Sequence, residues 1–396
     1  MRNNKTISYI LSILILLLSI VAVGENNKRV SSTSTTDMII NNENMKAIWV
    51  SYITLDMQST DQTEDTFANK IESIVKTTKD SGFNTLIFQV RPFCDALYQS
   101  RYYPWSHILT GTQGENPRYD PLEIICEISH KYNISVHAWI NPYRVKSKNT
   151  PEKLSENNPY VENDSLGFEH KDSIYLDPSN KKAQQLITDG VIEIIKNYDI
   201  DGIQFDDYFY PENSDSVDNK QYEKYKKSSN KPLTKEKWRA QNVNTLIKNV
   251  YSSIKKTNNN IRFGISPQGN INNNYALGAD VKTWCKNKGY IDYICPQIYF
   301  SLDNPSLAFE ECLDQWIKLT KHKELKLYIG IAGYKGGTDN DEGTWLDNND
   351  ILKTEIQICE EKQTDGIMLY SYESFLNREN QPEIKNVVNH LTNISK

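Results

Sequence analysis

The chain has 396 residues and a net charge of −6, with 45 basic and 51 acidic side chains spread along it. It has no basic block of the kind that binds nucleic acid, so we expect no nucleic-acid partner. Six cysteines occur without a CxxC pair, and the six histidines lack metal-ligand spacing, so no metal or other cofactor is expected. Because the cysteines fall mostly in predicted helices and strands, we expect buried free thiols.

The first 24 residues have the pattern of a secretory signal peptide. Two basic residues precede an uncharged apolar run over 7–23, and the segment ends in a small-x-small cleavage pattern. An uncleaved membrane anchor is the alternative, because the run is nearly long enough to cross a bilayer. Either way, we expect the rest of the chain to be secreted or at the cell surface, with membrane contact only through an uncleaved segment. Residues 25–44 are predicted to be a flexible Ser/Thr-rich tether, and 45–396 one domain.

Eight strand-like runs follow along the chain, and each precedes a helical pattern. We expect strands at 46–53, 83–92, 134–145, 201–210, 261–267, 292–300, 326–334 and 366–375, and helices at 64–80, 121–132, 179–198, 235–256, 279–287, 306–322, 349–362 and 383–394. Alternating strands and helices favour parallel pairing, and eight units predict a single closed (β/α)8 TIM barrel of the α/β class. An open doubly wound sheet is the alternative, but no glycine-rich phosphate turn follows the first strand.

Three strand-to-helix loops are long, whereas the helix-to-strand joins are short. The long loops cover about 93–120, 146–177 and 211–233, and the last is polar enough to be mobile. In a barrel these loops all lie on the C-terminal face, where sites form. Long loops in compact domains are usually functional or disordered, so the sequence predicts a cleft on this face.

Polar residues recur on the inward phase of several predicted strands. They are Gln89 and Arg91; His137, Asn141 and Tyr143; Gln204, Asp206 and Tyr208; Ser266; and Gln297 and Tyr299. Burying one such group without a partner costs about 1–3 kcal/mol, so the set predicts a polar network, a site, or both. A satisfied polar core is the alternative, and His137, the deepest member, is equally consistent with a core histidine.

The acids on the same face carry the chemistry that we predict. Glycosidic cleavage needs a proton donor and a second carboxylate that acts as nucleophile or base. Asp206 ends the fourth strand and is our expected nucleophile or base, with Asp207, Asp95 and Glu373 as competing donors. Adjacent strand residues point apart, so Asp206 and Asp207 need not be the working pair. Many aromatic residues follow the strand ends, and flat rings can stack on sugars, which favours a carbohydrate substrate.

Several segments together resemble one bacterial family. "GFNTLIFQVRPFCDALYQSRYYPWSHILTGTQG", "HAWINPYRV", "DGIQFDDYFYP", "GISPQGN" and "PQIYF" are similar, in order, to glycosyl-hydrolase-like family ten. The resemblance implies an exported (β/α)8 glycosidase acting on a polysaccharide, with peptidoglycan glycan strands of the bacterial cell wall as the leading substrate. The matched positions are Gln89, Arg91, Asp95, His137, Asn141, Tyr143, Arg144, Asp206, Asp207, Tyr208, Ser266, Pro267, Gln297 and Tyr299. The family has a small residue where this chain has Phe93-Cys94.

Two other classes of function remain open at this point. The barrel could bind cell-surface carbohydrate without cleaving it, and acids alone do not prove turnover. A metal-dependent carbohydrate esterase would need a His-rich ligand set at the strand ends, which the sequence lacks. The acids favour a glycoside hydrolase over both alternatives.

Overall fold

The computed structural model describes residues 44–320 and 324–394. The predicted signal peptide and nearly all of the predicted tether lie outside these residues. Within the described part of the chain, no helix is both long and apolar enough to cross a membrane.

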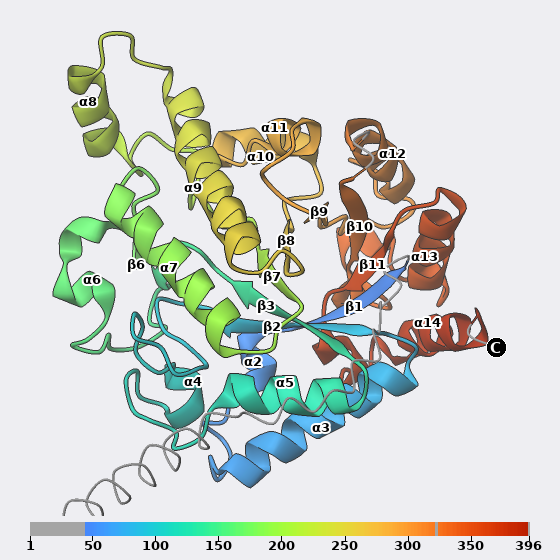
Figure 1. Ribbon diagram of the computed structural model, residues 1–396. Coiled ribbons are helices and arrows are strands. Elements are labelled where there is room, and N and C mark those ends of the chain that lie inside the picture. The colour runs from blue at the N-terminus through green and yellow to red at the C-terminus, as the bar shows by residue number, and fades with distance from the viewer. Residues whose placement is uncertain (1–43, 321–323, 395–396) are drawn as a thin grey trace, which may run out of the picture. The chain divides into compact units, whose positions relative to one another are not determined.

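Eight parallel strands close into a barrel, as the sequence predicts. The strands are β1 (Met45–Val50), β2 (Thr85–Arg91), β3 (Ser135–Ile140), β7 (Gly202–Phe205), β8 (Arg262–Ile265), β9 (Tyr293–Ile294), β10 (Lys326–Ile331) and β11 (Gly366–Leu369). They pair in chain order, and β11 pairs with β1 to complete the ring. Figure 1 shows helices packed around the outside of these strands. The predicted (β/α)8 barrel is confirmed.

A helix follows each strand, and local capping fixes several helix starts. The covering helices are α3 (Glu64–Asp80), α5 (Pro121–Lys131), α7 (Lys181–Asn197), α9 (Lys235–Thr257), α11 (Val281–Lys286), α12 (Phe309–Leu319), α13 (Ile351–Glu361) and α14 (Gln381–Ile394). The Asp120 side chain accepts from two backbone N–H groups of α5, and Pro121 occupies its first position. Helix α7 begins two residues after the predicted start at 179, because Asn180 caps it.

The core has an inner and an outer layer. The outer layer packs strand residues such as Phe88 and Ile203 against the helices. The inner layer fills the barrel with large side chains, including Trp49, Trp139 and Tyr293. The barrel is therefore a packed core rather than a pore, which leaves its C-terminal end for a site. All six cysteines are buried and free, as predicted.

The long loops have structure of their own. They contain the short helices α2 (Tyr52–Leu55), α4 (His107–Thr110), α6 (Pro159–Glu162), α8 (Asn219–Ser228) and α10 (Ile271–Asn274), with the 3-10 turns η1 (Asp164–Leu166), η2 (Tyr275–Leu277), η3 (Gly333–Lys335), η4 (Asp341–Gly343) and η5 (Tyr372–Phe375). The third strand is shorter than predicted, since β3 ends at Ile140. Residues Arg144–Lys146 form β4 of an antiparallel sheet, with β6 (Ser173–Leu176) central and β5 (Gly167–His170) beyond it.

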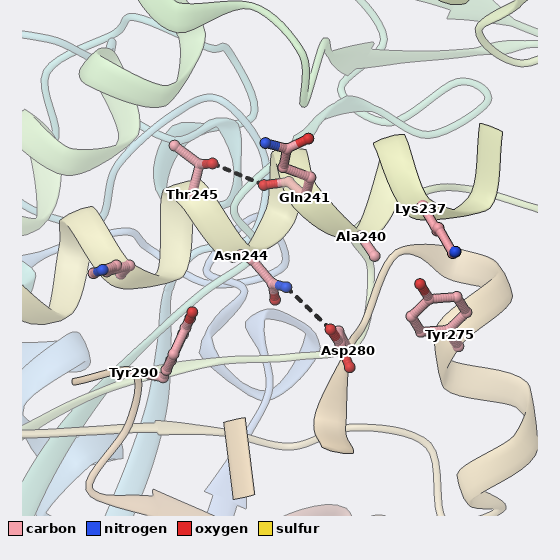
Figure 2. Close-up of a pocket in the computed structure, with 9 residues that line it drawn as sticks. Lys237, Ala240, Gln241, Asn244, Thr245, Tyr275, Asp280 and Tyr290 are labelled. Atoms are coloured by element: carbon pink, nitrogen blue, oxygen red, sulfur yellow. Dashed lines mark hydrogen bonds between the residues drawn. The ribbon is translucent and has the colours of Figure 1, made fainter. Parts of the chain in front are cut away.

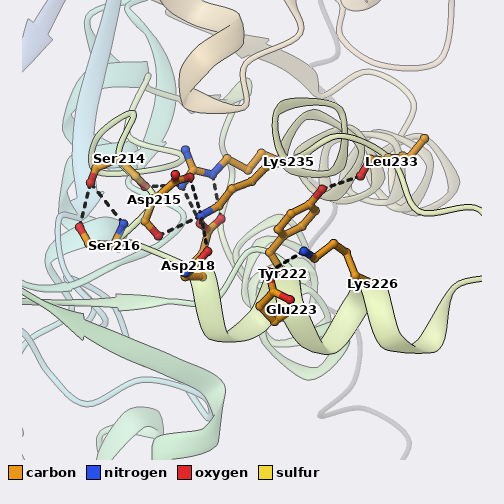
Figure 3. Close-up of polar contacts among 11 residues, drawn as sticks. Ser214, Asp215, Ser216, Asp218, Tyr222, Glu223, Lys226, Leu233 and Lys235 are labelled. Atoms are coloured by element: carbon orange, nitrogen blue, oxygen red, sulfur yellow. Dashed lines mark hydrogen bonds and ion pairs between the residues drawn. The ribbon is translucent and has the colours of Figure 1, made fainter.

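The loop after β7 carries α8 and is anchored by ion pairs. Arg239 donates to both carboxylate oxygens of Asp218, at 2.8 and 2.6 Å, and both side chains are buried. Lys235 lies 3.0 Å from Asp218 and 3.2 Å from Asp215 (Figure 3). No residue of α8 is buried, and in Figure 1 it lies at the outer edge of the ribbon. The ion pairs therefore fix the base of a loop that the sequence predicts only as polar.

Candidate active site

Asp206 lies where β7 ends, and its carboxylate is held from the neighbouring strand. Its Oδ2 atom accepts from Trp139 Nε1 at 3.0 Å and from the Asn141 side-chain amide. Its Oδ1 atom has only a 3.4 Å contact with the backbone N–H of Tyr208. The side chain is buried at the C-terminal end of the barrel, which we call the mouth. It points toward the barrel axis, as strand alternation predicts.

Burial changes the acidity of Asp206. The pKa of the carboxyl is about 7, because burial and, to a lesser extent, the nearby Asp207 raise it more than Arg144 and the hydrogen bond from Trp139 lower it. An acid whose pKa is near the working pH can both release and take up a proton during a reaction. Asp206 therefore has the protonation behaviour of a general acid or base at neutral pH.

Asp207 points to the other side of β7, toward residues that follow β8 and β9. Its Oδ1 accepts from Gln297 Nε2 at 3.0 Å, and the same amide donates to the Ser266 carbonyl at 2.8 Å. Burial raises the pKa of Asp207, while hydrogen bonds from Gln297 and Gln268 lower it. The two adjacent acids thus contact different strands, as alternation predicts, yet remain close enough to interact electrostatically.

Asn141 connects Asp206 to two further polar side chains. Its Oδ1 accepts from Gln89 Nε2 at 2.5 Å and from Arg144 at 3.0 Å, which orients the amide so that its nitrogen donates to Asp206. Arg144 is itself fixed by donating to the Pro92 carbonyl at 2.7 Å. The predicted residues Gln89, Asn141 and Arg144 therefore form one network with Asp206.

Aromatic rings surround this network. The Arg144 guanidinium lies 4.8 Å from the centre of the Phe93 ring and 5.5 Å from that of Tyr208, which is 52% exposed. Phe93, where the sequence departs from the family pattern, thus packs against a site residue. Exposed rings beside polar groups match the mixed surface of a sugar.

Tyr370 is a site residue that the sequence reasoning missed. Its ring centre lies 5.7 Å from that of Tyr299, 5.9 Å from those of Trp49 and Tyr334, and 6.4 Å from that of Trp139. Because Met368 faces the barrel interior, alternation places Tyr370 on the same side, so the signal was present in the sequence. Tyr299 is the member of this group that was predicted.

Asp95 belongs to a different environment. It is fully buried, and its Oδ2 accepts from Gln113 at 3.0 Å and lies 3.1 Å from His107 Nδ1. Gln113 also accepts from Asn158, which joins this group to the next loop. The contacts give Asp95 a role in loop structure and remove it from the candidates for proton donor.

Both carboxylate oxygens of Glu373 also accept hydrogen bonds from neighbouring side chains. Its Oε1 accepts from Ser51 at 2.6 Å and from Thr54, and its Oε2 accepts from Ser371. Three hydroxyl groups from the ends of β1 and β11 thus occupy both oxygens. This side chain joins two loops at the mouth, so it is a poorer donor candidate than Asp207.

Arg91 does not share the inward phase of Gln89, contrary to the prediction. The register between β2 and β3 shifts between these residues, which turns Arg91 outward. Its guanidinium lies 4.8 Å from the centre of the Tyr103 ring and donates to the carbonyls of Asn141 and Pro142. Arg91 therefore points toward Tyr103 in the outer core and supports the backbone under the site.

Four other residues of the predicted inward polar set are buried. His137 lies 3.0 Å from the Tyr293 hydroxyl, and burial lowers its pKa to about 4, so it is a neutral core histidine. Gln204 accepts from Trp49 Nε1 at 2.6 Å below the acids. Tyr143 packs in the outer core. The backbone carbonyl of Ser266 accepts a hydrogen bond from Gln297. None of these four positions fits direct contact with a sugar.

The arrangement defines a class. A (β/α)8 barrel with two acids at the end of its fourth strand, and aromatic rings around them, has the architecture of a glycoside-hydrolase barrel. Within the described residues, no three His, Cys, Asp or Glu side chains gather as a metal site.

The chain belongs to the glycosyl hydrolase-like 10 family, whose model matches residues 44–347. It is 37% identical over 292 residues to the glycosyl hydrolase YngK of Bacillus subtilis. The aligned residues cover 69% of this chain and 56% of that protein. It is 35% identical over 340 residues to the glycosyl hydrolase DigH of Escherichia coli, covering 78% and 76%. The chain thus spans little more than half the length of the first of these relatives.

Solved structures share the fold at low sequence identity. The glycoside hydrolase domain of PgaB (BpsB) from Bordetella bronchiseptica superposes with a TM-score of 0.62 at 11% identity, covering 88% of this chain and 99% of that one. An Anoxybacillus alpha-amylase gives 0.52 at 11% identity, covering 89% and 77%. These similarities establish the barrel fold and no more.

Proposed function

We propose that the protein is a glycoside hydrolase that cleaves polysaccharide glycan strands, and that its substrate is the peptidoglycan of a bacterial cell wall. The observation that carries the proposal is Asp206: a buried carboxyl with a pKa of about 7, beside a second carboxyl, in an aromatic-lined barrel mouth. Membership of the glycosyl hydrolase-like 10 family supports hydrolysis.

The pair divides the two tasks of glycosidic cleavage. Two N–H donors occupy Asp206 Oδ2, which leaves Oδ1 as the oxygen that carries the proton. Asp206 gives this proton to the oxygen of the leaving sugar as the bond between that oxygen and the anomeric carbon breaks. Asp207, whose carboxylate is held by Gln297, attacks the anomeric carbon or activates the water that does. These roles reverse the order that we expected for Asp206 from the sequence.

The remaining network positions the acid. Asn141 and Trp139 fix the direction of the Asp206 carboxyl, and Arg144 moderates its pKa. A pre-positioned acid avoids reorganisation during the reaction, which is where much of the catalytic gain arises. Tyr208 and Tyr370 offer ring faces on which sugars can stack.

Two features support a cell-wall substrate. The N-terminal pattern of the sequence predicts export, which would bring the enzyme to the wall. Arg144, half-buried at the mouth, suits a glycan that carries carboxylate groups, such as strands with muramic acid.

The test is hydrolysis of purified glycan strands freed of peptide stems. We expect the wild-type protein to generate new reducing ends, and the Asp206→Asn variant to generate them on the order of 10²–10⁴ times more slowly. Asp207→Asn should be similarly impaired, because no carboxylate is then left to attack the anomeric carbon or to activate the water that does. Hydrolysis left intact in Asp206→Asn overturns the catalytic assignment. Binding of strands by the wild type without any new reducing ends, over a broad pH range, indicates a carbohydrate-binding barrel instead.

A further inference from the structure

A polar groove runs along the outside of the barrel, away from the acids. It lies between α9 and the segment that leads from β8 through η2 into α11, and it has a volume of about 280 Å³ (Figure 2). Its size and its mixture of polar and aromatic walls are suited to a small number of sugar rings.

Aromatic and basic side chains recur along this groove. Tyr275 and Tyr290 lie toward opposite ends of it in Figure 2, and Tyr275 is 37% exposed. Lys237 and Lys248 also line it, eleven residues apart on α9, which corresponds to about 16 Å of helix. The groove is therefore elongated, and a chain-like ligand could contact a ring and an ammonium group more than once.

The middle of the groove is rigid. Asn244 Nδ2 donates to Asp280 Oδ2 at 3.1 Å, and its Oδ1 accepts from Trp284 Nε1 at 2.5 Å. Asp280 also accepts from the Thr283 hydroxyl at 2.6 Å, as part of the cap of α11. These side chains are fixed before any ligand arrives, which lowers the entropy cost of binding.

The charges in the groove favour an anionic ligand. Lys237 and Lys248 are exposed, and within the described residues neither forms an ion pair or donates a hydrogen bond. Asp280 faces them from the opposite wall, but its oxygens already accept from Asn244 and Thr283. The charged side chains that line the groove are these two lysines and Asp280, so the lining has one net positive charge.

One end of the groove is joined to the strand that carries the catalytic acids. Tyr210 donates its backbone N–H to the Leu277 carbonyl at 3.3 Å, and its hydroxyl accepts from Asn242 at 3.3 Å. Gly278 packs so closely that an added Cβ would lie 2.8 Å from the Tyr210 ring. The turn that carries Tyr275 is thus held against the loop that follows Asp206 and Asp207.

We propose that the groove is a second glycan-binding site, which holds a carboxylate-bearing stretch of the polysaccharide outside the catalytic mouth. The choice of ligand rests on the proposed function, but binding in the groove does not require hydrolysis. Tyr275 and Tyr290 would stack on sugar rings, and Lys237 and Lys248 would pair with carboxylates.

The experiment measures binding in the full chain carrying Asp206→Asn, so that the probe is not consumed. The probe is soluble glycan strands freed of peptide stems, whose muramic acid residues have free carboxylates. Calorimetric titration should give a roughly tenfold weaker Kd when Tyr275→Ala and Tyr290→Ala are added, which is about 1.4 kcal/mol. Tyr275→Phe with Tyr290→Phe keeps both rings and should restore the affinity. An unchanged Kd in the double alanine variant overturns the proposal.

Charge is tested with a second pair and a neutral probe. Lys237→Gln with Lys248→Gln should weaken binding of the acidic strands severalfold and leave neutral chitin oligosaccharides unaffected, whereas Lys256→Gln, exposed elsewhere on α9, should change neither. Equal losses for both probes contradict an acidic ligand.

Hydrolysis provides an independent readout. With wild-type acids, the alanine pair should raise KM for long strands and leave kcat on short oligosaccharides unchanged. If the wild type hydrolyses nothing, the proposed function fails, and the titrations still decide the groove.

Discussion

Asp206 at the end of β7 and Asp95 in the loop after β2 are both buried, but different groups surround the two carboxyls. Asp95 accepts from Gln113 and lies 3.1 Å from His107 Nδ1. Asp206 also accepts two hydrogen bonds, but its nearest carboxylate neighbour is Asp207, and its pKa rises to about 7. Burial alone therefore does not mark a catalytic acid. The difference lies in the neighbours: side chains of its own loop contact Asp95, whereas a second carboxyl beside Asp206 disfavours its charged form.

The largest expected effect that follows from this contrast is on the pH dependence of stability. The pKa of Asp206 is raised on folding from about 3.8 to about 7, so the folded state binds its proton more tightly. Its contribution to stability is present below pH 3.8 and is lost as the pH rises to about 7, at about 1.4 kcal/mol per pKa unit. Asn at this position does not titrate. In urea titrations, the free energy of unfolding of Asp206→Asn relative to wild type should therefore rise by a few kcal/mol between pH 4 and pH 8. A constant difference would contradict the raised pKa.

The second prediction concerns Asp95, the buried aspartate in the loop after β2. Asp95→Asn should lower the free energy of unfolding by about 1–3 kcal/mol, because the new amide NH2 takes the place of Oδ1, which is buried without a hydrogen-bond partner. Thermal melting would detect this loss. Once the protein is folded, the pH profile of hydrolysis should match that of the wild type. A displaced pH profile would restore Asp95 to the list of catalytic candidates.

The third prediction tests how Arg144 affects the pKa of Asp206. Arg144 lowers the pKa of Asp206, so Arg144→Gln should raise it. With Asp206 as proton donor, kcat/KM falls as the pH rises past this pKa, and the variant should move that fall to higher pH. We also expect kcat/KM at neutral pH to drop about tenfold or more, because Asn141 loses one of the two donors that orient it. Arg101→Gln, at an exposed ion pair with Glu193, is the matched control and should leave the profile in place.

The sequence predicted the barrel and the two directions of Asp206 and Asp207, because both depend on alternation, which is a local property. It could not separate Asp95 from the site, since the contacts of Asp95 come from within a loop that has no periodic pattern. Arg91 was misplaced for a related reason: one shift in the register of β2 reverses the face on which the next residue lies. Tyr143 was misplaced because β3 ends at Ile140, after which the phase of the strand no longer applies.

The smallest expected effect tests the aromatic part of the site. Tyr208 is 52% exposed, so Tyr208→Ala leaves little cavity and should not change the melting temperature appreciably. Loss of its ring should raise KM for glycan strands about threefold to tenfold, the scale of one aromatic contact, with a smaller change in kcat. Tyr208→Phe keeps the ring and should remain near wild type. If the alanine variant instead lowers kcat strongly at unchanged KM, then the Tyr208 side chain acts on the Asp206–Asp207 pair. In that case Tyr208 would take part in catalysis with the two acids, and its role would not be limited to binding the sugar.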